Sequence, residues 1–167
     1  ATGAALPEYA SLKFRPGSGN MSDFNVGSAC SYPMMRVEEM YFIEAEAAAQ
    51  QNPAQGVNLL NDFMSNHRDP HYKCTKSSKE DVVKEIVFQK RVELWGEGQC
   101  FFDIKRLNLP VTRGYTGTLH HTIGRFNTTT RPAWMNFCIV RSEGNNNTAL
   151  VGFENPDPSD VYSSWAE

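Results

Sequence analysis

The sequence predicts a mainly α-helical protein, with antiparallel helical hairpins over residues 34–106 and a long loop-rich region with little β structure over residues 107–167. Three observations support this prediction. Apolar residues between positions 34 and 106 recur three and four positions apart, which is the spacing of one helix face. Short breaks at residues 52–53 and 96–98 divide this stretch into separate helices. The region after it is crowded with Thr, Gly, Arg and His and shows neither the helical nor the strand period.

The first helix is expected over residues 34–51. Pro33 stands where proline suits the first turn of a helix, and the alanines near the end are the best helix formers. The pair Asn52-Pro53 breaks the helix. The residues that give the helical spacing, and with it the expected inward face, are Val37, Met40, Tyr41, Ile43, Glu44, Ala47 and Ala48.

The second helix is expected over residues 53–67, with Val57, Leu60, Phe63 and Met64 on one face. The connection to the first helix is very short. The two helices should therefore form an antiparallel hairpin, which residues 69–70, Asp-Pro, bring to an end.

The third helix is expected to open at Ser77, because Glu80 three residues later completes a capping box. A break at residues 96–98 then leads into a short fourth helix that ends near Arg106, so that residues 78–106 form a second hairpin packed on the first. The inward stripe of the third helix is Val83, Ile86, Val87, Lys90 and Leu94, widened by Phe88, Val92 and Trp95.

The two ends of the chain carry weaker signals. Residues 1–33 are rich in Gly, Ser, Pro and Asn and read as an extended, loop-like lead-in. In the C-terminal region, residues 134–140 indicate a short strand and residues 145–147 a turn. A tail this long without helices is unusual in a compact domain, so it is expected to wrap the helices and serve function or to be disordered.

Composition excludes several classes of protein. The 167 residues are enough for a sizeable core, and 40% hydrophobic residues suit a folded protein. The net charge is −3 and no run of Lys and Arg exceeds two, so nucleic-acid binding is not expected. No stretch of eighteen apolar residues is present, and residues 1–6 do not resemble a signal peptide, so an exported protein would be represented here by its mature form or a piece of it.

The four cysteines form no CxxC pair, which argues against a zinc site. Their disulfide state is left open: Cys30, Cys74, Cys100 and Cys138.

Two groups of residues could carry chemistry, and each has a structural alternative. Glu93 and Glu97 are four apart and could form the carboxylate pair of a glycosidase. Gly96 lies between them and basic residues lie nearby, so ion-pair and capping roles are favoured. Residues 67–71 contain His, Asp and His, but Pro70 prevents them from lining one helix face as metal ligands. No catalytic residue, metal site or cofactor is therefore expected.

The loop-rich region contains the candidate ligand-binding residues Tyr115, Arg125 and Trp134. Aromatic faces bind sugar rings by stacking, and guanidinium and amide groups such as those of Arg125 and Asn127 supply hydrogen bonds. Binding residues also tend to lie on loops held by a rigid scaffold. The alternative for Trp134 is that it anchors the tail on the helices. Phe137 and Phe153 are expected to have that packing role.

Three strings in order, "MMRVEEMYFIEAEAAAQ", "GVNLLNDFMSNHR" and "IVFQKRVELWGEGQCFFDIKR", resemble the SusD/RagB family of outer-membrane nutrient-binding proteins. A fourth string, "FCIVRSE", is similar to the closing F-P-I-P-x-x-E of that family, and the resemblance covers about residues 30–156. The chain departs from the family pattern at Cys100, at Gln89-Lys90, and at Cys138 and Val140. The residues that match the first three strings are Arg36, Glu39, Glu44, Ala45, Glu46 and Ala47, then Leu60 and Asn61, then Arg91, Glu93, Leu94, Glu97, Gly98, Asp103 and Arg106.

The resemblance implies a tetratricopeptide-like helical stack over residues 34–106, with residues 107–167 as a loop-rich cap. The break at residues 96–98 would connect one helix of the stack to the next, and Glu93, Glu97 and Arg106 would be ion-pair and capping residues. Members of the family are longer than this chain. The chain is therefore expected to be a single domain or a C-terminal portion, with the signal peptide, the lipid-anchor cysteine and further helical repeats in an N-terminal half.

The function that the resemblance implies is non-enzymatic binding of glycans or other nutrients at the bacterial outer surface. The protein would be held at the outer membrane by a lipid anchor absent from this chain, and would deliver its ligand to a TonB-dependent, SusC-like transporter. The alternative is a helical-repeat scaffold for protein–protein contact only. A glycoside hydrolase using Glu93 and Glu97 is a third, weaker interpretation.

Overall fold

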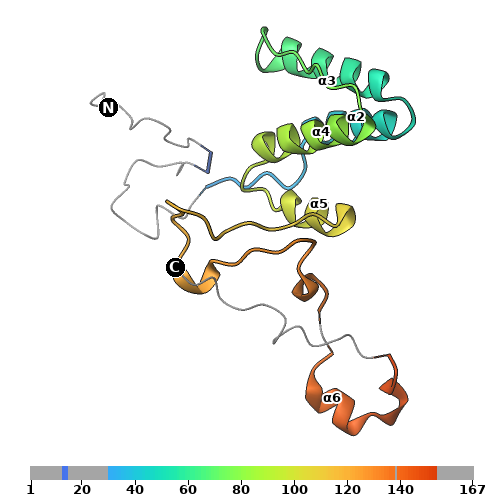
Figure 1. Ribbon diagram of the computed structural model, residues 1–167, viewed down its shortest axis with the longest axis vertical. Coiled ribbons are helices and arrows are strands. Elements are labelled where there is room, and N and C mark those ends of the chain that lie inside the picture. The colour runs from blue at the N-terminus through green and yellow to red at the C-terminus, as the bar shows by residue number, and fades with distance from the viewer. Residues whose placement is uncertain (1–12, 15–29, 138, 154–167) are drawn as a thin grey trace. The chain divides into compact units, whose positions relative to one another are not determined.

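The computed structural model describes residues 13–14, 30–137 and 139–153, which belong to two compact units, residues 1–93 and 94–167 (Figure 1). Helices dominate the first unit, whereas short helices alternate with loops in the second, and the β structure within the described residues is one isolated bridge between Thr112 and Asn127. The predicted fold class, mainly α with a loop-rich C-terminal region, is confirmed. None of the described helices is long and apolar enough to cross a membrane.

The first unit is built from three helices of fifteen residues each: α2 (Val37–Gln51), α3 (Pro53–His67) and α4 (Lys79–Glu93). Helix α2 packs against both α3 and α4 (Figure 1). The predicted bounds of α3 are confirmed, and its start has a clear cause, since the Asn52 side chain accepts a hydrogen bond from the Ala54 N–H and Pro53 occupies the first turn. The first hairpin is thus as predicted. Helix α2, however, begins at Val37, so Pro33 lies outside it.

A close approach between α2 and α3 fixes the core of this unit. A Cβ atom on Gly56 would lie 2.5 Å from the Cβ of Ala49 and 2.9 Å from the carbonyl oxygen of Ala45, so only glycine allows the two helices to pack at this distance. Phe42 and Phe63 meet edge to face beside this contact, with ring centroids 5.1 Å apart. The buried core residues are Phe42, Ala45, Ala49, Leu60, Phe63, Met64, Cys74, Val82 and Ile86.

The inward face predicted for α2 is wrong. Val37 is 64% exposed and Ile43 46% exposed, and Met40 and Tyr41 are also exposed, whereas Phe42, Ala45 and Ala49 are buried. The apolar residues of α2 are distributed around the whole helix, so their spacing alone does not indicate which face is buried. The buried face of α2 is the one that packs against Gly56, where the small side chains of Ala45 and Ala49 fit.

Helix α4 agrees better with its prediction, although its start and its outer face differ. Ser78 caps the helix, because its Oγ accepts a hydrogen bond from the Asp81 N–H (3.1 Å), one residue later than the expected Ser77–Glu80 box. The expected widening of the inward stripe is also wrong. Phe88 and Val92 lie four residues apart on the exposed side of α4, and Trp95 after the helix is 56% exposed. Of the predicted stripe, Ile86, Val87, Lys90 and Leu94 are buried, which confirms most of it, and Val83 is partly buried at the edge of the core. The fully buried Val82 is not part of the predicted stripe.

The second unit begins at Leu94, and its first helix is α5 (Gln99–Leu107). Gly96 and Gly98 have φ values of 78° and 85°, in the left-handed region that glycine adopts without strain, which explains the break before α5. Because α4 and α5 belong to different units, the second predicted hairpin stays a prediction. Likewise, the description of the chain as one domain or fragment is not tested.

Short helical segments replace two of the features expected after α5. The remaining elements are η1 (Thr122–Gly124), η2 (Ala133–Met135), α6 (Arg141–Asn146) and η3 (Thr148–Leu150). The strand expected over residues 134–140 is wrong, since Trp134 lies in η2 and the other described residues of that stretch form no strand. The turn expected at residues 145–147 is the end of α6 and its cap. The predicted lead-in at residues 1–33 lies mostly outside the described residues.

Candidate ligand-binding surface

Glu93, at the end of α4, is the centre of an ion-pair network in the first unit. Its carboxylate accepts hydrogen bonds from Arg68 Nε and Nη2, at 2.6 and 2.8 Å, and from Arg36. Glu38 completes the network, with Oε1 3.1 Å from Arg68 and 3.0 Å from Arg36. The backbone carbonyl of Glu93, one of the last of α4, also accepts from Arg36 Nη1 and Lys13 Nζ, both at 3.2 Å. The ion-pair role predicted for Glu93 is confirmed, while the end of α4 is capped by Arg36 and Lys13.

This network sets the protonation state of Glu93. The hydrogen bonds from Arg68 lower the pKa of Glu93, burial acts in the opposite direction, and the Arg36 bonds lower the pKa further. The general acid of a glycosidase needs a carboxyl group with a raised pKa. Glu93 therefore has the wrong electrostatic environment for that role. In the second unit, Arg106 pairs with the buried Asp103 (2.8 Å), which agrees with the ion-pair role expected for this arginine.

His67 and His71 make local contacts in this part of the chain, and that of His71 is made by its backbone N–H. The ring of His67 packs against Phe63 with centroids 5.6 Å apart, and Asp69 accepts a hydrogen bond from the His71 N–H. Among the described residues, no group of three His, Cys, Asp or Glu side chains gathers as metal ligands would. Of the cysteines, Cys30, Cys74 and Cys100 lie in the described residues and are free thiols.

Two antiparallel segments of the second unit, residues 111–115 and 125–128, form the scaffold of the candidate site. The Arg113 N–H donates to the Phe126 carbonyl (3.0 Å) and the Thr128 N–H to the Val111 carbonyl (2.9 Å). The Asn127 side chain fixes the register. Its Oδ1 accepts from the Gly114 N–H and its Nδ2 donates to the Gly114 carbonyl. Asn127, expected as a ligand donor, is therefore part of the scaffold.

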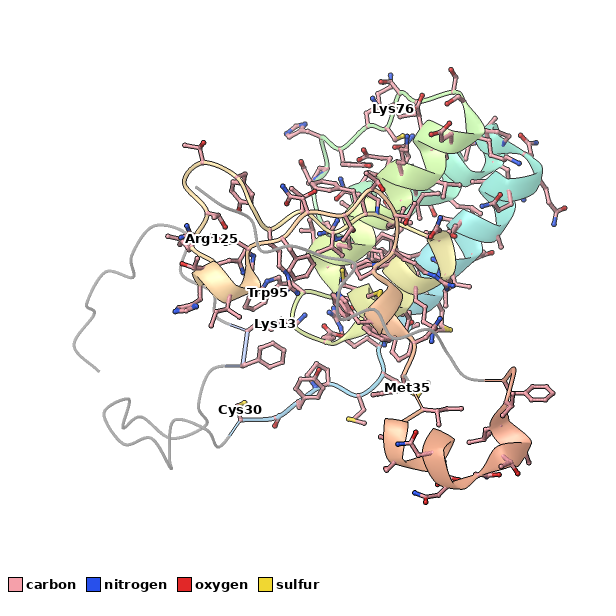
Figure 2. All side chains as sticks on the ribbon, turned by 60° about the horizontal axis from the view of Figure 1, so that its bottom comes forward. Lys13, Cys30, Met35, Lys76, Trp95 and Arg125 are labelled. Atoms are coloured by element: carbon pink, nitrogen blue, oxygen red, sulfur yellow. The ribbon has the colours of Figure 1, made fainter. Side chains whose placement is uncertain are left out.

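The loop between these segments is closed by hydrogen bonds of its own. Arg125 Nε donates to the His120 carbonyl at 2.7 Å, which holds the end of the loop to its middle. Figure 2 labels Arg125. The Thr118 N–H donates to the Tyr115 carbonyl, and Gly117 provides the positive φ that the turn requires. Arg125 thus takes part in holding its own loop together.

An aromatic and cationic cluster lies beside this scaffold, and we name it the Trp134 cluster: Arg113, Phe126 and Trp134. The rings of Phe126 and Trp134 meet edge to face, with centroids 5.8 Å apart. The Arg113 guanidinium carbon lies 5.0 Å from the centre of the Phe126 ring, within the range of a cation–π contact. Trp134 is nevertheless 41% exposed, so part of its indole faces solvent.

The structure does not gather the three predicted site residues into one contact cluster. Trp134 contacts Phe126, which also contacts Arg113, whereas Arg125 binds the backbone of its loop. Tyr115 is 53% exposed and has no aromatic contact among the described residues. Sequence reasoning missed Arg113. One signal could have found it: Arg113 and Tyr115 are two apart, and such residues share one side of an extended segment.

Comparison with known proteins identifies the family. The sequence pattern of the SusD family matches residues 9–156. A crystal structure of a SusD-like carbohydrate binding protein from Bacteroides vulgatus ATCC 8482 is 27% identical in sequence and superposes with a TM-score of 0.60. The similarity covers 85% of this chain and 34% of that one, so the chain spans about a third of the length of that protein. No curated protein matches the chain. With the ordered sequence strings, the helical fold and this match over most of its length, the chain belongs to the SusD family.

Proposed function

We propose that the protein binds glycans without chemical turnover at the surface of the outer membrane. The observation that carries the proposal is the match to the SusD family over residues 9–156, together with a similar structure described as a carbohydrate binding protein. The half-exposed indole of Trp134 supports it from the structure. A sugar ring can stack on such a face, and Phe126 holds the indole in place by an edge-to-face contact.

The proposal includes the setting in which the protein works. In the full-length protein, a lipid anchor holds it at the outer membrane, and it passes its ligand to a TonB-dependent, SusC-like transporter. The present chain then corresponds to a C-terminal portion. The chain spans 34% of the similar structure, which supports the part of the proposal that places it within a longer protein.

The surroundings of Glu93 argue against one assignment, in which Glu93 is the general acid of a glycosidase. A glycosidase needs one carboxyl group that stays protonated long enough to donate to the leaving group. Two arginines bind the Glu93 carboxylate and lower its pKa, which favours the ionised form. The carboxylate also supports the packing of three helix ends, which explains its presence without any chemistry.

One observation favours the alternative, a helical scaffold for protein–protein contact. Met40 and Ile43 on α2, and Phe88 and Val92 on α4, are exposed apolar side chains of the kind found at contact surfaces. This surface is compatible with glycan binding elsewhere on the protein. Only a direct binding measurement distinguishes a scaffold from a glycan-binding protein.

The test is a glycan array probed with the purified protein, followed by chromatography of every bound glycan after prolonged incubation. The proposal predicts binding to at least one oligosaccharide and no released sugar. A folded protein that binds no glycan would favour the scaffold. Sugar release that Glu93→Gln abolishes, without loss of the fold, would establish an enzyme.

A further inference from the structure

The charges of the chain are distributed unevenly around the candidate site. Residues 104–142 contain six of the sixteen Lys and Arg residues and none of the nineteen Asp and Glu residues, although the whole chain has a net charge of −3. This acid-free stretch contains both scaffold segments, the closed loop and the Trp134 cluster. The cations in it are Lys105, Arg106, Arg113, Arg125, Arg131 and Arg141.

The contacts of these cations differ, and Arg113 is the one that belongs to the Trp134 cluster. Arg106 pairs with Asp103, and Arg131 donates to the Lys105 carbonyl at 3.2 Å, so both hold the backbone or α5 in place. The recorded contact of Arg113 is with the face of Phe126. Within the described part of the chain, no carboxylate lies at ion-pair distance from Arg113, and no carbonyl accepts a hydrogen bond from its guanidinium.

A guanidinium in this position is suited to bind an anion. The contact with Phe126 restricts the side chain, and within the described residues neither a carboxylate nor a carbonyl engages the guanidinium N–H groups, so they are available to a ligand. Those N–H groups match the two oxygens of a carboxylate or a sulfate. Trp134 contacts the same Phe126 ring, so the cation and the stacking surface are neighbours on one aromatic side chain.

We propose that the ligand is an anionic saccharide, bearing a uronate carboxylate or a sulfate ester, and that Arg113 recognises its charge while the sugar ring stacks on Trp134. This rests on the proposed function. The absence of carboxylates from residues 104–142 supports it, because an acidic side chain beside the site would repel such a ligand. A nucleic acid is a poorer candidate, since it needs many phosphate contacts and the chain as a whole is acidic.

The experiment is isothermal titration of the full-length protein with four probes: trigalacturonate, its methyl ester, a chondroitin sulfate tetrasaccharide, and maltotriose. The first two share one sugar chain, and esterification replaces the charged carboxylates of the first by neutral methyl esters. The third carries sulfate esters as well as uronates, so tighter binding of the third than of trigalacturonate indicates recognition of the sulfate. A single-stranded oligonucleotide tests for general polyanion binding. The variants are Arg113→Gln, which removes the charge, and Arg113→Lys, which keeps the charge but not the planar fork. Arg91→Gln, at an exposed arginine of α4, is the matched control.

The proposal predicts that at least one anionic glycan binds and that its neutral counterpart binds at least about tenfold more weakly, which is the scale of a hydrogen bond to a charged group. Arg113→Gln should weaken binding of the anionic probe by about tenfold or more, Arg113→Lys by less, and Arg91→Gln not at all. Thermal melting of each variant shows whether the fold is intact. If Arg113→Gln does not fold, the test rests on Arg113→Lys and on the charged and esterified pair.

Three outcomes would overturn the proposal. If neutral glycans bind as tightly as charged ones, or if Arg113→Gln binds the anionic probe like the wild type, the ligand is not recognised by its charge at Arg113, and the proposed glycan binding still stands. If the oligonucleotide binds as tightly as the best glycan, the site is a general polyanion site. If no glycan binds at all, the proposed function fails together with this inference.

Discussion

Replacing Gly56 by alanine tests the packing that defines the first unit. In most helices this change stabilises a protein by about 0.5–1 kcal/mol, because glycine loses more conformational entropy on folding. Here the added Cβ would lie 2.5 Å from the Cβ of Ala49, 2.8 Å from its Cα and 2.9 Å from the carbonyl oxygen of Ala45. Carbon atoms pack best at about 3.5–4.0 Å, so α2 and α3 must separate by roughly 1 Å.

The two effects have opposite signs, and the structure indicates which one is larger. Two of the three atoms in the way belong to the backbone of α2, so no side-chain rotation relieves the contact. Overpacking of this kind costs about 1–3 kcal/mol, and separating the helices also loosens Phe42 and Phe63 beside them. We therefore expect Gly56→Ala to lower the free energy of unfolding by about 1–2 kcal/mol despite the gain in helix propensity.

Urea denaturation followed by circular dichroism measures this free energy. Gly144→Ala is the matched control, because Gly144 is also helical and a Cβ there meets nothing within 4 Å. The control should be neutral or slightly stabilising. The double variant Gly56→Ala with Ala49→Gly should recover part of the loss, since it removes the 2.5 Å contact. A Gly56→Ala protein as stable as the wild type, or more stable, would refute the close packing of α2 on α3.

Two further predictions concern Glu93 and Leu94. The pKa of Glu93 is lowered in the folded state, so its contribution to stability is present above the ordinary glutamate pKa of about 4.3 and is lost as the pH falls through the lowered value. Glu93→Gln should therefore be less stable than the wild type at neutral pH, and its free energy of unfolding should fall less steeply in acid. Glu80→Gln, at an exposed residue, is the control and should follow the wild type. An acid limb of the stability curve that is unchanged in Glu93→Gln would contradict the arginine network. Leu94 is 3% exposed, and Leu94→Ala should destabilise by about 2–5 kcal/mol in the same urea assay; a denaturation curve like that of the wild type would show that Leu94 is not a core residue.

The helices could be predicted where local chemistry is decisive. The bounds of α3 agree with the prediction because the pair Asn52-Pro53 breaks the preceding helix, residues 69–70 follow its end, and its apolar residues occupy one face. The start of α4 was missed by one residue, since Ser77 and Ser78 are each followed three residues later by a carboxylate. The face of α2 could not be predicted, because apolar residues surround that helix and the choice depends on Gly56, a contact with another helix.

The candidate site was predictable in part. The exposure of Trp134 and Tyr115 agrees with the expectation that aromatic residues of this region are accessible to a ligand, while their function as ligand-binding residues stays a prediction. The contact of Trp134 with Phe126, and of Phe126 with Arg113, joins residues of a segment that shows no periodicity, so no sequence rule indicated it. The same holds for the use of Asn127 in the scaffold.

The central claim is that this protein binds a glycan at the Trp134 cluster, and titration of the full-length wild type and Trp134→Ala with the best glycan of the array tests it most directly. A stacking aromatic is worth at least about 1 kcal/mol on truncation, so Trp134→Ala should raise the dissociation constant about fivefold or more. Phe88→Ala, at a similarly exposed aromatic residue of α4, should bind like the wild type. Equal affinity of the wild type and a folded Trp134→Ala would contradict the claim and place the ligand elsewhere on the protein.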